Sequence, residues 1–156
     1  MQDEPDYDDP ETEERWCMER REEVADYLQG QGLNHGEIGE WPAWHVPPYV
    51  SIWAIESVKE PGWVGWWAIC GDLPTDYISA AGIGMHPRAA LRAFCKQWQT
   101  VADAMRDKRK PADITIGRPE DWPTLEPLLS SRIGILQRWA ADDSVWDYDE
   151  SEFEER

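Results

Sequence analysis

Residues 49–70, YVSIWAIESVKEPGWVGWWAIC, carry the strongest signal for secondary structure in this chain. The segments Tyr49–Ser57 and Trp63–Cys70 are rich in β-branched and aromatic side chains, which favour strands. Lys59–Gly62 between them contains the proline and glycine that are typical of tight turns. The sequence therefore predicts an antiparallel hairpin. Because both faces of each strand are largely apolar, we expect most of both sides of the sheet to be covered.

Three helices are expected besides this hairpin. The first covers Thr12–Gln29 and is followed by Gly30 and Gly32, either of which can end a helix. The second covers Pro87 to about Arg109 and repeats apolar side chains every three or four residues, as a buried helix face does. The last begins at Thr124, whose hydroxyl can cap free backbone amides.

The remaining segments complete the predicted architecture. Leu33–Pro48 has no regular period and several prolines and glycines, so it is expected to be an ordered loop. Asp113–Gly117, DITIG, is expected to form a short strand after the stop at Pro111. The fold class is α+β: a single domain with a small antiparallel sheet, built on a central hairpin and packed with about three helices.

Charge is concentrated at the two ends of the chain. Of 156 residues, 32 are acidic and 15 basic, for a net charge of −17. Residues 1–14 hold eight acids and no base, and residues 142–156 hold eight acids and one base, so residues 15–141 have a net charge of −2. We interpret this as a domain at 15–141 with two acidic segments. These either keep the protein in solution, or mimic nucleic acid, or bind a basic partner.

Direct nucleic-acid binding is not expected, because it needs a clustered basic surface. The tight basic cluster, Arg106 with Lys108, Arg109 and Lys110, falls where the second helix ends and there complements the negative end of the helix dipole.

The sequence favours a cytoplasmic protein. The acidic start is the opposite of a cationic signal region, and the longest apolar run, Trp63–Cys70, is far below the ~20 residues that span a bilayer. Three unevenly spaced cysteines fit a reducing compartment better than a disulfide scaffold.

Tryptophans mark the candidate functional region. Six of the 11 lie between Trp41 and Trp67, and Gly39–Pro48, GEWPAWHVPP, sets Trp41, Trp44 and His45 on a loop stiffened by prolines. Such a loop is either a plug that seals one end of the sheet or the wall of a pocket. The predicted ligand or partner surface consists of Trp41, Trp44, His45, Trp53, Trp66, Asp72, Asp76 and His86.

Two catalytic or metal-binding alternatives stay open. Cys70 is a candidate nucleophile with His45 or His86 as base and Asp72 as orienting group, but no nucleophile motif surrounds it. The histidines also lack the close spacing of common metal sites. A metal set would consist of His35, His45, His86 and either Glu37 or Asp72. We assign no catalytic residue, expect no cofactor or metal, and consider an enzyme the less favoured class.

The motifs GEWPAWHVPP, VSIWAIES, PGWVGWW and ICGDLPTDY together resemble a family of small bacterial proteins catalogued as a domain of unknown function. The resemblance covers about residues 13–143 and includes RWC at 15–17, HPR at 86–88 and WAADD at 139–143. It implies no activity. The favoured hypothesis is a binding or adaptor protein that uses the aromatic loop, the acidic tails and the strand end at 72–77. The alternative is an enzyme or small-ligand sensor with a pocket at the same place.

Overall fold

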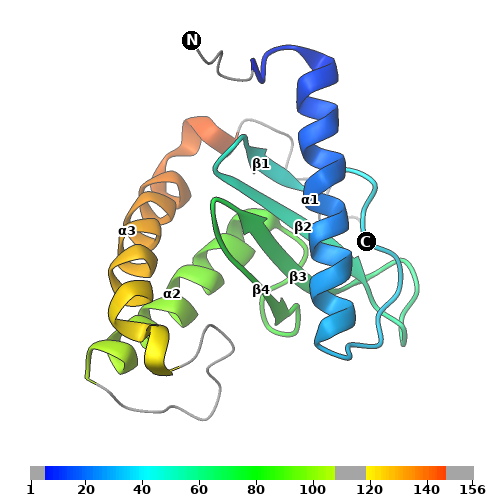
Figure 1. Ribbon diagram of the computed structural model, residues 1–156. Coiled ribbons are helices and arrows are strands. Elements are labelled where there is room, and N and C mark those ends of the chain that lie inside the picture. The colour runs from blue at the N-terminus through cyan, green and yellow to red at the C-terminus, as the bar shows by residue number, and fades with distance from the viewer. Residues whose placement is uncertain (1–5, 108–118, 147–156) are drawn as a thin grey trace. The chain divides into compact units, whose positions relative to one another are not determined.

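The two predicted strands form the centre of a four-stranded antiparallel sheet in the computed structural model, which describes residues 6–107 and 119–146 (Figure 1). The strands follow the order β1-β2-β3-β4. They are β1 (Trp44–Val46), β2 (Val50–Glu56), β3 (Val64–Gly71) and β4 (Leu73–Ser79). In the turn between β2 and β3, the Trp63 amide donates to the Glu60 carbonyl at 3.0 Å, so the predicted hairpin is confirmed.

Both edge strands were missed from the sequence. The prediction of a loop over Leu33–Pro48 is wrong at Trp44–Val46, which pairs with β2. The strand β4 contains Pro74, a residue that interior strands exclude because it cannot donate to the ladder. At the edge of a sheet one side of the strand needs no such donor, so the proline is tolerated there.

The β1–β2 and β3–β4 turns lie side by side at one end of the sheet. The Asp72 amide donates to the Tyr49 carbonyl at 2.9 Å. Gly71 makes this approach possible, because its φ is +146° and a Cβ there would lie 2.5 Å from the Tyr49 oxygen.

The helix α1 (Pro10–Gly30) has a polar cap at its start and a glycine after its end. Asp9 Oδ2 accepts a hydrogen bond from the Thr12 amide at 3.1 Å, which starts the helix two residues before the predicted position. Gly32 has a φ of +70° and donates to the Gln29 carbonyl at 3.0 Å. The predicted glycine stop is therefore confirmed at Gly32.

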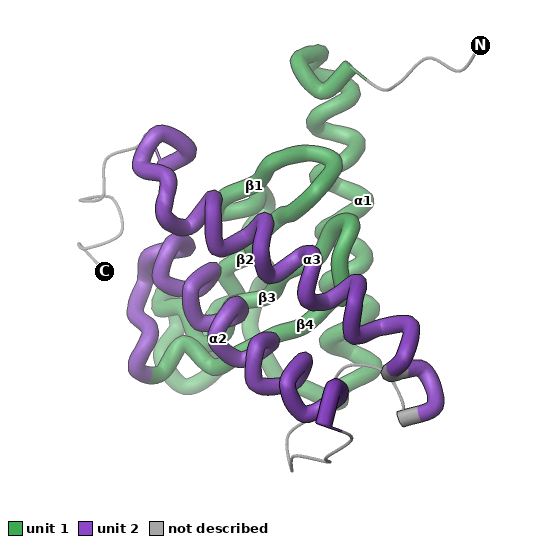
Figure 2. Tube along the Cα trace, turned by 90° about the vertical axis from the view of Figure 1, so that its left-hand side faces the viewer, with its two compact units in different colours: residues 1–81 green, residues 82–156 purple. Residues whose placement is uncertain are grey.

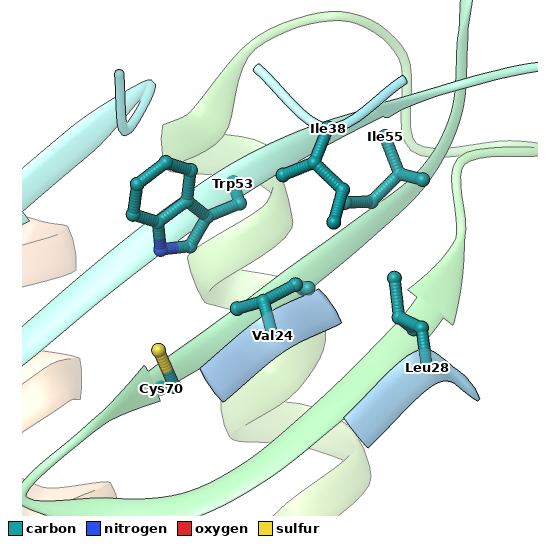
Figure 3. Close-up of a cluster of buried hydrophobic side chains, with 7 residues drawn as sticks. Val24, Leu28, Ile38, Trp53, Ile55 and Cys70 are labelled. Atoms are coloured by element: carbon teal, nitrogen blue, oxygen red, sulfur yellow. The ribbon is translucent and has the colours of Figure 1, made fainter. Parts of the chain in front are cut away.

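One face of the sheet packs against α1. Val24 and Leu28 of the helix point toward Trp53, Ile55 and Cys70 of the strands (Figure 3). The complete buried cluster consists of Val24, Leu28, Ile38, Trp53, Ile55, Ala68 and Cys70. Side chains of the opposite face, such as Ile52 and Trp67, are buried as well, which agrees with the apolar pattern on both faces.

The chain divides into two compact units, residues 1–81 (unit 1) and residues 82–156 (unit 2), coloured separately in Figure 2. Unit 1 contains α1 and the sheet. Unit 2 contains α2 (Pro87–Arg106) and α3 (Trp122–Ala141), which pack on each other, and the short helices η1 (Pro119–Asp121) and η2 (Asp143–Trp146). The α+β class, with an antiparallel sheet and three α-helices, is confirmed.

Two helix boundaries in unit 2 differ from the predictions. α2 ends at Arg106 rather than near Arg109. α3 begins at Trp122, and Thr124 lies inside its first turn, so the predicted cap at Thr124 is wrong. Pro123 explains the earlier start, because its fixed φ suits the first helical turn. The bases at 108–110, Pro111 and the predicted strand at 113–117 lie outside the described residues.

None of the helices within residues 6–107 and 119–146 is both long and apolar enough to cross a membrane.

Candidate functional site

His45 of β1 lies at the centre of an aromatic cluster in unit 1. Its ring stacks on Trp16 with centroids 6.2 Å apart and meets Trp41 edge-on at 5.8 Å. Its Nε2 lies 3.1 Å from Glu13 Oε2, and only 17 % of the side chain is exposed. We call this group the aromatic site; it consists of Tyr7, Glu13, Trp16, Arg20, Trp41 and His45.

α1 supplies half of the aromatic site, and the sequence analysis missed this contribution. Glu13, Trp16 and Arg20 follow one another at the three- and four-residue spacing of a single helix face. The Arg20 guanidinium lies 5.6 Å above the Trp16 ring, and Tyr7 meets the same ring edge-on at 6.3 Å. The signal was present in the sequence, since this spacing puts an acid, an indole and a cation on the side of the helix that faces the sheet.

Arg21 fixes the loop that carries Trp41. Its Nε donates to the Gly39 carbonyl and its NH2 donates to the Ile38 carbonyl, each at 2.9 Å. The Gly39 amide in turn donates to the Ala54 carbonyl of β2 at 3.0 Å. The loop is therefore held from both sides, by α1 and by the sheet, while the Trp41 side chain stays 46 % exposed.

The other tryptophans of the predicted surface have less exposed side chains than Trp41. Trp44 and Trp53 are buried, and the Trp53 Nε1 donates to Ser51 Oγ at 2.9 Å. Trp66 is half-buried against the cluster of Figure 3. These three fill the interior of unit 1, as a core or plug requires.

The two predicted carboxylates have different surroundings. Asp72 is exposed in the β3–β4 turn, which lies beside Tyr49 of the β1–β2 turn. Asp76 is fully buried, and its Oδ1 accepts from the Tyr77 amide at 2.8 Å and from the Tyr27 hydroxyl at 3.5 Å. Burial, with the Asp76 charge, raises the pKa of Tyr27 well above its usual value, so Tyr27 stays a neutral donor.

His86 belongs to unit 2, where it caps α2. Its Nδ1 accepts from the Arg88 amide at 3.0 Å, and its ring lies 6.1 Å from that of Trp146. Arg88 Nε donates to the Ala140 carbonyl at 2.8 Å, and its NH2 lies 2.7 Å from Asp143 Oδ1. The HPR and WAADD motifs therefore meet in space and join the start of α2 to the end of α3.

The surroundings of Cys70 do not suit a nucleophile. The thiol is fully buried, and its Sγ donates to the Arg20 carbonyl at 3.5 Å. Burial raises the pKa of Cys70 to about 12, and it raises those of Cys17 and Cys95 to about 11. Reactive cysteines need the thiolate, which this environment disfavours. All three cysteines are free thiols.

The part of the chain that the structure describes contains no group of three or more His, Cys, Asp or Glu side chains arranged to hold a metal ion. His35, one of the candidate ligands, has its Nδ1 2.6 Å from the Gly36 carbonyl.

Charge differs strongly between the two units. Residues 1–81 contain 18 acidic and four basic side chains, whereas residues 82–156 contain 14 acidic and 11 basic ones. The aromatic site thus lies in a strongly acidic part of the chain.

Residues 11–146 match a protein family described as a domain of unknown function, DUF4826. The chain belongs to the DUF4826 family. The DUF4826 match includes the aromatic loop, the sheet, α2 and α3, as the resemblance of the motifs predicts. No curated protein and no solved structure matches the chain.

Proposed function

We propose that this DUF4826 chain is a non-enzymatic binding protein whose aromatic site takes a lysine- or arginine-bearing segment of a partner protein. The observation that carries the proposal is the half-exposed Trp41 indole on a loop fixed by Arg21. A fixed aromatic side chain loses little entropy on binding, and tryptophan is enriched among the residues that dominate binding energy.

The chemistry of the aromatic site favours a cationic partner. A guanidinium already lies 5.6 Å above Trp16, which is the arrangement in which a cation and an indole attract each other. The Trp41 indole offers the same chemistry at the surface. Glu40, which precedes Trp41 in the loop, has an exposed carboxylate that would steer a positive segment.

The same charge argues against nucleic acid as the partner, since 18 acids and four bases in residues 1–81 repel phosphates. The three free thiols support the further proposal that the protein works in the cytoplasm.

A peptide titration tests this function. The ¹⁵N-labelled chain is titrated with a lysine- and arginine-rich peptide and with a glutamate-rich peptide of equal length, while the indole N–H signals are followed. The basic peptide is expected to shift the Trp41 signal, and the acidic peptide is expected to leave it unchanged. Trp41→Ala is expected to weaken binding by about tenfold, the effect of losing one anchor.

Trp63→Ala is the matched control, because Trp63 is 44 % exposed and follows the β2–β3 turn, away from His45. Equal weakening by both substitutions, or binding that depends only on peptide charge, would count against an anchor at Trp41.

A second candidate function is a small-ligand sensor or enzyme at the same site. It is favoured by the Glu13–His45 pair, since a carboxylate 3.1 Å from an imidazole is the arrangement of a general base. Native mass spectrometry of gently purified protein, compared with a denatured sample, tests it. A small mass that is lost on denaturation, and is absent from the Trp41→Ala variant, would favour this candidate over the peptide-binding function.

A further inference from the structure

Unit 2 has a surface hollow of about 570 Å³ along α2 and α3, a volume within the range of small-molecule sites. Five of its lining side chains carry hydrogen-bonding groups: Arg92, Lys96, Gln99, Thr100 and Gln137. None of these residues belongs to the aromatic site or to the surface predicted from the sequence.

Two positive charges border the hollow. Arg92 and Lys96 are exposed and four residues apart on α2, so they lie on one helix face. Within residues 6–107 and 119–146 neither has an ion-pair partner. Arg88, one turn earlier on α2, does have an ion-pair partner, since its NH2 lies 2.7 Å from Asp143 Oδ1.

Two further acids lie near the lining residues in sequence. Asp142, which directly follows the lining residue Ala141, accepts hydrogen bonds at its Oδ1 from the Ser144 amide at 3.0 Å and the Ser144 hydroxyl at 2.7 Å. Asp103 Oδ1 accepts from Gln99 Nε2 at 3.0 Å and lies 3.2 Å from Arg106 NH1. Arg92 and Lys96 therefore give the α2 side of the hollow a positive charge on an otherwise acidic chain.

The floor of the hollow is apolar. Cys95 and Ala140 are both buried and contribute a thiol and a methyl group. The raised pKa of Cys95, a result of burial, keeps this thiol neutral, so the floor adds no negative charge. Cations at the rim above an apolar floor suit a molecule with an anionic group and a short carbon skeleton.

We propose that this hollow binds a small metabolite with two negative charges on oxygen, either a phosphate monoester or a dicarboxylate. The Arg92 guanidinium matches the planar fork of a carboxylate or phosphate, and Lys96 provides a second point charge. The Gln137 amide lines the hollow and can donate a further hydrogen bond to the anion. The Thr100 hydroxyl also lines it, but already donates to the Lys96 carbonyl at 3.3 Å. Because the cations are exposed, the affinity is expected in the millimolar to high micromolar range.

The test uses three probes with the full chain: inorganic phosphate, succinate, and succinamide as the uncharged analogue of succinate. Backbone and side-chain amide signals of α2 and α3 are followed by ¹H–¹⁵N NMR. Phosphate and succinate are expected to shift the signals of Lys96, Gln99 and Gln137 in a saturable manner, and succinamide is expected to leave them unchanged. The dissociation constants fitted to the phosphate and succinate titrations show which oxyanion the hollow binds more tightly.

Arg92→Gln combined with Lys96→Gln is expected to weaken binding by about tenfold or more, since both charges are removed. Arg138→Gln is the matched control, because Arg138 is an exposed cation of α3 that does not line the hollow. It is expected to change the affinity by less than about twofold. The proposal is overturned if the three probes act alike, if shifts do not saturate, or if the control weakens binding as much as the double variant.

Discussion

The two units of this chain differ more in charge than in size. Unit 1, residues 1–81, has 18 acids, four bases and a site of indoles and a histidine. Unit 2, residues 82–156, has 14 acids, 11 bases and a hollow bordered by two cations. Most of the net charge of −17 therefore belongs to unit 1. A negative net charge favours a cationic partner for unit 1. It does not predict the charge of a ligand for the hollow of unit 2.

The two units also differ in the kind of contact that stabilises each of them internally. In unit 1 a fully buried indole, Trp53, lies in the cluster between α1 and the sheet. In unit 2 a polar side chain, Arg88, joins two motifs more than 50 residues apart, through the Ala140 carbonyl and Asp143. The stabilisation from burying apolar side chains scales with the buried area. The stabilisation from a polar side chain depends on whether each of its groups keeps a hydrogen-bond partner. Substitutions that remove either buried apolar surface or a polar contact test this difference between the units.

The largest effect is expected for Trp53→Ala. It removes a fully buried indole and leaves Ser51 Oγ without its donor. The free energy of unfolding should fall by about 3–5 kcal/mol, as measured by urea denaturation followed by circular dichroism. Trp63→Ala, at an exposed indole of the same hairpin, should change it by less than about 0.5 kcal/mol. Similar losses for both would contradict a core role that is specific to Trp53.

A smaller effect is expected for Arg21→Ala, which removes the donor of two backbone carbonyls, those of Ile38 and Gly39. The free energy of unfolding should fall by about 2–3 kcal/mol, because a partly buried charged donor is lost and the carbonyls lose their partner. Hydrogen exchange of the Gly39 amide should become faster. Arg15→Ala, at an exposed position of the same helix, is the control. Unchanged exchange at Gly39 would show that Arg21 does not fix the loop.

In unit 2, Arg88→Gln should lower the free energy of unfolding by about 1–2 kcal/mol, since the bond to the Ala140 carbonyl is lost. Asp143→Asn should leave it within measurement error, because the Asp143 side chain is 93 % exposed and water screens its ion pair. Thermal unfolding of the two variants separates these contributions. If Asp143→Asn destabilised the chain as much as Arg88→Gln, the ion pair rather than the carbonyl bond would join the motifs.

The smallest effect is expected for Glu56→Gln at the end of β2. Hydrogen bonds from the amides of Gly62 and Glu37 hold the pKa of the Glu56 carboxyl below its usual value. A lowered pKa stabilises the fold above the unfolded pKa, and this stabilisation is lost as the pH falls through the folded pKa. The Tm of the wild type should therefore exceed that of the variant at pH 7, and the difference should shrink as the pH falls through the lowered pKa of Glu56.

Glu60→Gln, in the following turn, controls for the general loss of a negative charge from unit 1. A Tm difference for Glu56→Gln that stays constant between neutral and acidic pH would exclude the carboxylate as its cause.

Local signals made the central part of the fold predictable. The β-branched and aromatic residues of β2 and β3, the turn between them and the apolar period of α2 all act within a few residues. The edge strands β1 and β4 were missed for the opposite reason. Their sequences contain or adjoin prolines, and whether a proline is tolerated depends on a neighbouring strand that local patterns do not reveal.

The candidate site was predictable in part. The GEWPAWHVPP motif identified Trp41 and His45 from composition alone, but it could not reveal which of the nearby indoles would be exposed. The partners of His45 on α1, Glu13 and Trp16, lie about 30 residues earlier in the chain. The hollow on α2 and α3 was missed because its side chains look like ordinary surface polar residues in each helix taken separately.

The fold class, the hairpin, the helical segments and the family of this protein could all be predicted from the sequence, because each depends on short-range patterns of side chains or on contiguous motifs. The pairing of Glu13 with His45, the burial of Cys70 and Asp76 and the hollow bordered by Arg92 and Lys96 became visible in the folded chain alone. Those outcomes depend on which helix face meets which strand or helix. That choice is made by burial of the whole apolar surface rather than by any single segment.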